Sequence, residues 1–362
     1  MNIRTLICSA AILFAAGTLR AQSPIENIVL VTIDGFRWQE VFSGMDSALA
    51  RNPRFNQNDS ASIFSRYWAS GPDERRAKLL PFLWSTVAGE GRIYGNRLLN
   101  SRVDNANPYW FSYPGYSEIL CGYVDTAINS NDYPPNPHQT VLEFLNNEPG
   151  FKNQVAAFGA WDAFDRIINE ERSGIPVVSA FQACGGNSPS PRERLLNEML
   201  RDSPTPWGAE ECLDLFTHYA AKEHLALRHP RVLYIAYGET DEWAHAGQYA
   251  SYLNAAHQND AWIGELWDAI GSDPFYAKKT ALVLAVDHGR GAGEKWTSHG
   301  QSVPGAHEIW FAVLGPGIPA KGEMEGGGQL FQKQLAQTIA SLVGLTYRAR
   351  HPVAEKVDLF TR

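Results

Sequence analysis

The sequence is poor in cysteine and in clustered positive charge. Four cysteines among 362 residues argue against a closed structural zinc site, because such sites usually rely on cysteine ligands. Lysine and arginine do not occur in consecutive runs, and the formal net charge is −8. This charge distribution argues against binding to nucleic acid or anionic membranes through electrostatic attraction alone. There is no internal repeat or low-complexity tract, and a hydrophobic content of 44% is ample for a sizeable core.

A targeting segment is expected at the N-terminus. Arg4 precedes an apolar run over residues 6–19, and Ala21 supplies a small residue at the expected cleavage site. The run is too short to cross a bilayer comfortably and lacks a stop-transfer flank. We therefore expect a signal peptide over residues 1–21, no membrane span, and a mature protein that is periplasmic or secreted.

Export would leave three cysteines in the mature chain, Cys121, Cys184 and Cys212. An oxidising compartment permits one disulfide, and Cys184–Cys212 is the preferred pair because Cys121 lies in an apolar stretch. Three unpaired thiols are the alternative, and the sequence does not choose between the two.

Short apolar runs, each followed at once by polar residues, recur at 28–33, 155–160, 231–237, 281–286 and 309–314. Runs that are apolar throughout predict strands covered on both faces. Helices are expected over 140–147, 211–228, 249–270 and 332–342, the first with a capping box formed by Thr140 and Glu143. These patterns predict an α/β protein with a central, largely parallel sheet and helices on both faces, and the length allows one large domain or two unequal lobes. The poorly periodic segments 43–81 and 184–208 are expected to insert as a loop-rich cap over the strand ends.

Acidic and imidazole side chains follow three of these strands. In open α/β sheets the carboxyl ends of the strands carry the site, and residues 241 and 245 would share one face of a helix. Each residue alone has a structural explanation as a helix cap or a packed histidine. Together they form a mixed set that suits zinc, and six are too many for one catalytic ion and about right for two. The six are Asp34, Asp241, His245, Asp287, His288 and His299.

The order and spacing of these residues resemble the alkaline phosphatase superfamily, especially its nucleotide pyrophosphatase/phosphodiesterase branch. The matching pieces are Thr-Ile-Asp-Gly-Phe-Arg at 32–37, Asp-x-x-x-His at 241–245, Asp-His-Gly at 287–289, and His-Gly at 299–300 before Phe-Ala-Val-Leu-Gly-Pro at 311–316. The resemblance runs from about residue 28 to the helix at 338–344, and it implies a single domain over 22–362 with an alkaline-phosphatase-like fold and two Zn²⁺ ions per chain. It assigns one ion to Asp241, His245 and His299, and the other to Asp34, Asp287, His288 and the nucleophile.

His307 is the rival of His299. We prefer His299 because the family's late histidine is followed by glycine and then by a strand ending in Gly-Pro. His307 directly precedes the run 309–314 and is expected to be structural.

The nucleophile is expected in the stretch Phe-Ser-Tyr-Pro-Gly-Tyr-Ser-Glu at 111–118, which resembles the family's Thr-Phe-Pro-Asn with Ser112 in place of threonine. Pro114 suits the first turn of a helix, so Ser112 would lie at a helix N-terminus that favours negative charge. Its rival, Ser117, would lie inside that helix. A zinc ligand role for Ser112 would activate the hydroxyl, and the resemblance implies a phosphoseryl intermediate.

The expected substrate is a small-molecule phosphate ester. Asn131 lies where relatives carry a phosphate-binding asparagine, although Asn129 is equally close. Trp161 and Asp162 follow the run 155–160 and are candidates for the substrate pocket, with packing and capping as the alternative roles.

The charge near the nucleophile bears on the type of ester. A monoester carries an extra negative charge, which favours added Lys or Arg at the phosphate, and no basic pair adjoins Ser112 or Asn131 in the sequence. Arg37, Arg166 and Arg290 are the arginines within reach from loops. This pattern favours a diester, or a nucleotide pyrophosphate, over a monoester.

Two alternatives remain open. Sulfatases share the fold, but their Cys/Ser-x-Pro-x-Arg motif is matched here only through Ser112 and Pro114, with Tyr116 at the arginine position. They also bind a single calcium through oxygen ligands, whereas this chain offers three histidines. The second alternative is a non-catalytic exported protein with a structural zinc. The sequence carries no indication of the oligomeric state.

Overall fold

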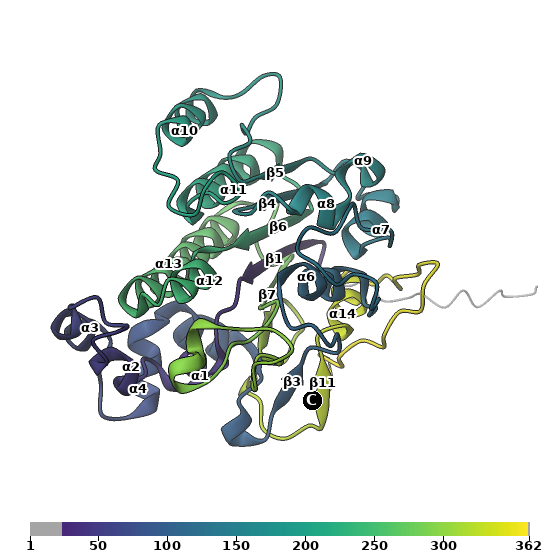
Figure 1. The fold of residues 1–362 in the computed structure, drawn as a ribbon. Coiled ribbons are helices and arrows are strands. Elements are labelled where there is room, and N and C mark those ends of the chain that lie inside the picture. The colour runs from purple at the N-terminus through teal and green to yellow at the C-terminus, as the bar shows by residue number, and fades with distance from the viewer. Residues whose placement is uncertain (1–23, 361–362) are drawn as a thin grey trace, which may run out of the picture.

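Eight strands form the central sheet of the computed structural model, which describes residues 24–360 (Figure 1). The expected signal peptide at 1–21 lies outside the described residues. The strand order is β10-β2-β9-β7-β1-β6-β4-β5, and a smaller sheet has the order β11-β3-β8. The strands are β1 (Asn27–Ile33), β2 (Gly91–Tyr94), β3 (Arg102–Asp104), β4 (Val155–Gly159), β5 (Val177–Ser179), β6 (Val232–Tyr237), β7 (Thr280–Ala285), β8 (Glu308–Ile309), β9 (Phe311–Leu314), β10 (Gly322–Glu323) and β11 (Gln329–Phe331).

The middle of the sheet is parallel, as the sequence predicts. Strand β1 pairs in parallel with β6 on one side and with β7 on the other, and β4 pairs in parallel with β6 and β5. The run 309–314 is an exception within this sheet, because β9 lies antiparallel to both β7 and β2. Its Gly315–Pro316 end therefore points to the edge opposite the carboxyl ends of β1, β6 and β7.

The helices are α1 (Trp38–Ser43), α2 (Ser47–Arg51), α3 (Ser60–Tyr67), α4 (Pro72–Leu79), α5 (Ala88–Glu90), α6 (Ser112–Cys121), α7 (Val141–Asn147), α8 (Phe164–Ile168), α9 (Glu170–Ser173), α10 (Pro191–Arg201), α11 (Asp214–Arg228), α12 (Glu239–His245), α13 (Tyr249–Ser272) and α14 (Gln334–Leu342). Three shorter helical turns are η1 (Leu83–Val87), η2 (Arg97–Leu99) and η3 (Gly293–Thr297). None of the helices within residues 24–360 has the length and hydropathy needed to cross a bilayer.

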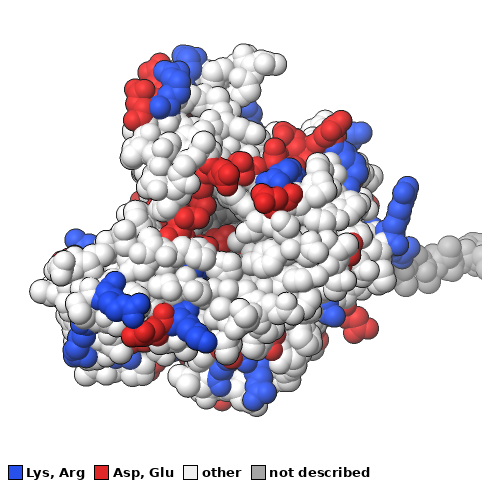
Figure 2. All heavy atoms as spheres, viewed as in Figure 1, with Lys and Arg blue, Asp and Glu red and all other residues white. Residues whose placement is uncertain are grey.

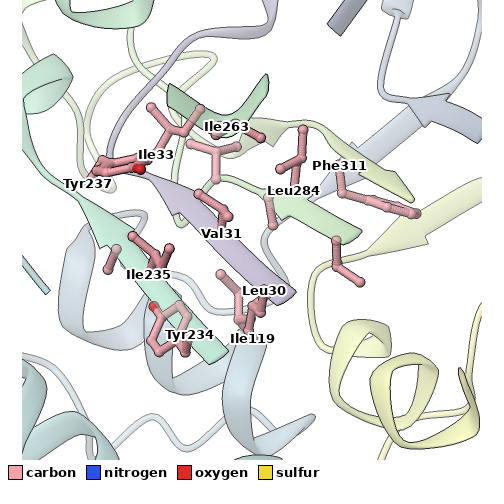
Figure 3. Packing of buried hydrophobic residues seen from close by; sticks show 14 of the residues in the cluster. Leu30, Val31, Ile33, Ile119, Tyr234, Ile235, Tyr237, Ile263, Leu284 and Phe311 are labelled. Carbon is pink, nitrogen blue, oxygen red and sulfur yellow. The ribbon is translucent and has the colours of Figure 1, made fainter. Parts of the chain in front are cut away.

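Helices cover both faces of the sheet. On one face Tyr234 of β6 packs against Phe164 of α8, and on the other Tyr237 packs against Trp262 of α13. Figure 3 shows the same division, with Ile119 of α6 and Ile263 of α13 on opposite sides of β1. Every residue of β1, β6 and β7 is buried, which explains why these strands read as continuous apolar runs.

The two segments expected to form a cap contain helices. Residues 43–81 carry α2, α3 and α4, and residues 184–208 carry α10, which projects from the body of the molecule beside α11 (Figure 1). Arg76 of α4 binds Glu323 of β10 at 3.0 Å, so the first segment is anchored on the sheet at β10. The role of both segments as a cap stays a prediction.

Two local expectations need correction. Thr140 caps α7 by accepting from the N–H of Glu143 at 3.0 Å, but the Glu143 carboxylate pairs with Arg172 at 2.8 Å, so only half of the capping box forms. The preferred Cys184–Cys212 disulfide is wrong for this structure, because both thiols are free. Cys184 Sγ lies 3.3 Å from Asn197, whereas Cys212 Sγ lies 3.7 Å from Thr217.

Candidate metal centre and active-site cleft

The expected ligands meet at one edge of the sheet because β7, β1 and β6 are parallel neighbours. Asp34 directly follows β1, and Asp287 and His288 follow β7. Asp241 and His245 lie on α12, which begins two residues after β6 ends. Strands that run side by side in one direction end at the same edge, so pairing across the sheet assembles residues that are far apart in the chain.

The residue after Asp34 is a glycine, Gly35, which allows the chain there to approach Asp241 closely. Gly35 has a φ of +56°, and a Cβ atom there would lie 2.3 Å from Oδ1 of Asp241. The N–H of Gly35 donates to Oδ1 of Asp287 at 3.1 Å. The glycine thus lets the carboxylates of Asp34, Asp241 and Asp287, which follow three different strands, come together.

Three carboxylates surround the imidazole of His288. Its Nε2 atom lies 3.3 Å from Asp34 Oδ1, 3.4 Å from Asp287 Oδ2 and 3.8 Å from Asp241 Oδ1. Burial lowers the pKa of His288, but the charges of Asp287 and Asp34 outweigh burial and raise this pKa to about 9. Burial, followed by the charge of Asp34, raises the pKa of Asp287 well above its usual value.

These residues fit a cation. The carboxylate oxygens Asp34 Oδ1 and Asp287 Oδ2 are buried and have no hydrogen-bond partner within residues 24–360. Nδ1 of His288 lies 3.0 Å from the carbonyl oxygen of Gly289, which can only accept, so Nδ1 carries a proton and Nε2 is the nitrogen that a cation would bind in place of its second proton. The buried carboxylates around Nε2 need positive charge among them, and a cation bound by Nε2 and the carboxylates would supply it in place of the Nε2 proton. Asp34, Asp287 and His288 form one group whose ligand atoms lie within 4.8 Å of one another.

A second group consists of Asp241, His288 and His299, again within 4.8 Å. His245 adjoins it, because its Nε2 lies 2.9 Å from Asp241 Oδ2 and 2.8 Å from His299 Nε2. The carbonyl oxygen of Trp110 lies 3.3 Å from Nδ1 of His299. Because a carbonyl oxygen only accepts, Nδ1 carries the proton of this imidazole, and the lone pair of Nε2 faces the cluster. Two imidazole nitrogens at this distance, beside a carboxylate, again suit a bound cation.

Ser112 is the first residue of α6, as its proline pattern predicts. The Ser112 hydroxyl oxygen lies 3.4 Å from Nε2 of His288. Its rival, Ser117, lies in the interior of α6, where its hydroxyl accepts from Asn136 at 3.0 Å and contacts Cys121. The structure therefore brings Ser112, and not Ser117, to the expected ligands.

These residues open into a cleft of about 290 Å³. Asn131, Trp161 and Asp162 line it, as expected from the sequence, whereas Asn129 is not among the lining residues. Asn131 Oδ1 accepts from the N–H of Tyr113 at 3.0 Å, which fixes the amide beside the start of α6. No residue of 43–81 or 184–208 lines this cleft within the described part of the chain.

Acidic side chains dominate the mouth of the cleft, and Figure 2 shows them gathered in a hollow of the surface. Arg166 is the only arginine or lysine among the described residues that line it. It donates to the carbonyl of Tyr133 at 3.1 Å and lies 3.8 Å from Asp162. The other acidic lining residues, which sequence reasoning missed, are Asp132, Glu210, Glu211 and Glu242.

Two further residues that the ligand pattern does not include support the ligands. Tyr116, one turn after Ser112, donates to Asp34 Oδ2 at 2.8 Å. Arg290 is fully buried, bonds Asp241, and donates to the carbonyl of Trp296 at 2.8 Å, so it ties Asp241 to the loop that leads to His299. No sequence pattern points to Tyr116 as a partner of Asp34. Arg290 could have been noticed, because it lies two residues after His288 of the Asp-His pair.

The remaining candidates lie outside the cluster. Arg37 pairs with Glu40 and donates to Gly291, and it does not line the cleft. His307 packs its ring against Trp110 at 4.9 Å between centroids, in agreement with the structural role expected for it.

No protein-family model and no curated protein sequence matches this chain. Solved structures do match in fold. The alkaline phosphatase PafA aligns with a TM-score of 0.60 at 10% identity over 93% of this chain and 98% of its own. A putative sulfatase from Bacteroides thetaiotaomicron aligns with a TM-score of 0.60 at 12% identity over 91% of this chain and 73% of its own. The phosphonate monoester hydrolase of Agrobacterium radiobacter aligns with a TM-score of 0.54 at 13% identity over 89% and 74% of the two chains.

These structures include a phosphatase, a putative sulfatase and a phosphonate monoester hydrolase, so the shared architecture does not by itself select the ester. The chain has the fold of the alkaline phosphatase superfamily.

Proposed function

We propose that this protein is an exported, two-zinc phosphoric ester hydrolase that acts on phosphodiesters through Ser112. The observation that carries the proposal is the 3.4 Å distance between the Ser112 hydroxyl and Nε2 of His288, inside a set of carboxylates and imidazoles whose ligand atoms lie close enough to hold metal ions. Export rests on the signal peptide expected at 1–21, and the diester preference rests on the charge of the cleft.

Two zinc ions fit the ligand atoms, one beside Asp241, His245 and His299, and the other beside Asp34, Asp287, His288 and Ser112. His288 stands in both groups of neighbouring ligand atoms, which supports two adjacent sites. When bound, the ions would favour the ionised serine hydroxyl, stabilise the departing oxygen and activate water.

The protein's own groups define the reaction path. Ser112 Oγ attacks phosphorus in line, the ester oxygen leaves as the alcohol, and a phosphoseryl intermediate forms. Water then attacks that phosphorus, and Ser112 recovers its proton as the phosphate monoester departs. The position of Ser112 at the N-terminus of α6 favours the negative charge that develops there.

Asn131 is suited to hold a non-bridging phosphate oxygen. Its Oδ1 atom is engaged by the N–H of Tyr113, which leaves the Nδ2 donors for a ligand in the cleft that Asn131 lines. An amide donor next to the nucleophile positions phosphate and stabilises charge in the transition state.

The charge of the cleft favours a diester. Besides the candidate ligands Asp34 and Asp241, five carboxylates line the cleft beside a monoester dianion, and one arginine offsets them. That arginine is already engaged by Tyr133 and Asp162. A diester carries one negative charge fewer than a monoester and meets less repulsion.

A sulfate monoester also carries one negative charge, so charge alone does not separate it from a phosphate diester. The sulfatase motif is incomplete here, because Tyr116 replaces its arginine and bonds Asp34 instead.

A rate comparison tests this function. The zinc-loaded protein is assayed on a phosphate monoester, a phosphate diester and a sulfate ester that share one leaving group, with Ser112→Ala protein from the same preparation as the control for contaminating enzymes. The proposal predicts the largest kcat/KM for the diester and no turnover by the variant. Preferential cleavage of the sulfate ester would replace it with the sulfatase interpretation, and no turnover of any ester would favour a non-catalytic zinc protein.

A further inference from the structure

The backbone is unusual two residues before Ser112. Trp110 has a φ of +54°, in the left-handed region that a bulky residue rarely adopts. Phe111 then returns to an extended conformation with a φ of −147°, and Ser112 begins α6. Strained backbone of this kind persists only where the surroundings hold it, and it is concentrated at functional sites. The turn at Trp110 therefore sets the direction in which the chain enters α6.

Asn107 holds this turn in place. Its Oδ1 atom accepts from the N–H of Tyr109 at 3.0 Å and from the N–H of Trp110 at 3.1 Å, so one side-chain oxygen binds two successive backbone donors. Asn107 is only 3% exposed, and its Nδ2 atom donates to Oε2 of Glu118 at 2.8 Å. The amide is therefore fixed from both of its ends.

Glu118 anchors Asn107 to the helix of the proposed nucleophile. It lies on α6 and is buried. Its carboxylate accepts from the N–H of Ala106 at 2.9 Å, from the N–H of Asn107 at 2.9 Å and from the N–H of Lys333 at 3.0 Å. The segment 106–111 is thereby closed onto the helix that it precedes, so the turn and α6 move as one unit.

The carbonyl of Trp110 faces the candidate metal centre. It accepts from the N–H of Gly300 at 3.0 Å and lies 3.3 Å from Nδ1 of His299. A carbonyl that binds the Nδ1 proton fixes the direction of the imidazole ring and leaves Nε2 for a metal ion. A negative φ at Trp110 would turn this carbonyl away from His299. Because the same peptide units lead into Ser112, one turn positions both a candidate ligand and the nucleophile.

We propose that Asn107 is a positioning residue of the active site. By holding Trp110 in the left-handed conformation, it aims one backbone carbonyl at His299 and places Ser112 at the same time. The indole of Trp110 packs against His307, outside the candidate ligands, so the role assigned here belongs to the backbone. This inference rests on the metal centre of the proposed function and adds to it the turn that links a ligand to the nucleophile.

The tautomer of His299 in the wild-type protein is the first test. Two-bond proton–nitrogen NMR spectra of zinc-free protein carrying isotopically labelled histidine distinguish the two neutral tautomers, at about pH 8, where an ordinary imidazole is neutral. The signals of His299 are identified by their loss in His299→Ala. The proposal predicts a proton on Nδ1 of His299, and a proton on Nε2 in its place would overturn it. This measurement requires neither bound zinc nor hydrolysis.

Two variants of Trp110 test the backbone conformation. Trp110→Asn and Trp110→Val both remove the indole, but asparagine enters the left-handed region more readily than a β-branched residue. We expect Trp110→Asn to bind zinc at least about tenfold more tightly than Trp110→Val in competition with a chromophoric chelator, and Asn107→Ala to bind it about 10- to 100-fold more weakly than the wild type.

Lys278→Val is the matched control for these variants. Lys278 also has a left-handed backbone, with a φ of +60°, but it precedes β7 and so lies at the end of the sheet opposite the cleft. The substitution places a β-branched residue in the same conformation and should leave zinc affinity unchanged.

The outcomes separate this inference from the proposed function. Equal zinc affinities in the two Trp110 variants, or wild-type affinity in Asn107→Ala, would overturn the positioning role while leaving the hydrolase intact. If a variant does not fold, as judged by circular dichroism, the tautomer of His299 in the wild type decides. If the wild type binds no zinc, the proposed function fails, and the His299 tautomer becomes the readout: Nδ1–H in the wild type that is lost in Asn107→Ala supports the inference, and the same tautomer in both refutes it.

Discussion

Tyr116 donates a hydrogen bond of 2.8 Å to Oδ2 of Asp34. The tyrosine lies on α6, one turn after Ser112, and the aspartate follows β1, so this bond links the helix of the proposed nucleophile to the end of a central strand. It also leaves Asp34 Oδ1 as the oxygen without a hydrogen-bond partner. Tyr116 thereby orients the carboxylate so that its second oxygen faces the cation site.

Replacing Tyr116 tests this positioning role. Tyr116→Phe keeps the ring but removes the donor, and loss of a group that orients a metal ligand typically costs about 10- to 100-fold in metal affinity or activity. We expect weaker zinc binding, measured by competition with a chromophoric chelator, and a lower kcat. Tyr276→Phe is the matched control, since it removes a buried hydrogen bond of 2.9 Å to the carbonyl of Pro230 and should leave zinc affinity unchanged. The role is refuted if both variants bind zinc as the wild type does.

Removing the Ser112 hydroxyl should separate chemistry from metal binding. Ser112→Ala is expected to abolish turnover, because the other hydroxyls at the start of α6 are the phenols of Tyr113 and Tyr116, which donate to Pro134 and Asp34. The variant should retain most of the bound metal through the aspartates and histidines. Activity assays and metal analysis of the same sample provide the measurement. A variant with full activity would eliminate Ser112 as the nucleophile.

A buried carboxyl away from the cleft makes stability depend on pH. Burial raises the pKa of Asp260 from 3.8 to about 7, although the N–H groups of Phe82 and Leu83 oppose this. The folded protein therefore holds a proton here that the unfolded chain releases between about pH 4 and 7, and this group lowers the free energy of unfolding as pH rises through that window. Thermal unfolding across this range should show a weaker decline in Asp260→Asn than in the wild type.

Asp268→Asn is the control for that experiment, because Asp268 lies on the same helix, α13, but is exposed. It should keep the wild-type dependence of Tm on pH. Identical slopes in Asp260→Asn and the wild type would contradict a raised pKa at Asp260.

The central sheet and the expected ligand set were predictable because their signals are local. Strands β1, β6 and β7 are buried on both faces, so their apolar runs are unbroken, and Asp34, Asp241 and Asp287 stand at or just beyond the strand ends. Parallel pairing then brings those ends together without further information. Ser112 was likewise marked by Pro114, which restricts where α6 begins.

The surroundings of the site depend on tertiary contacts that leave no periodic signal. Glu211 reaches the cleft only because its segment pairs with the segment of Trp161, 50 residues away. The bond from Arg290 to Asp241 depends on how two loops fold across the sheet edge. The antiparallel direction of β9 and the separate surroundings of Cys184 and Cys212 are also set by packing.

Metal analysis of the purified full-length protein tests the central claim, that these side chains hold two zinc ions beside Ser112. Inductively coupled plasma mass spectrometry is expected to find about two zinc ions per chain, with Asp287→Asn and His299→Ala each retaining less. Calcium as the only bound metal, or full hydrolase activity after complete removal of metal, would contradict the account.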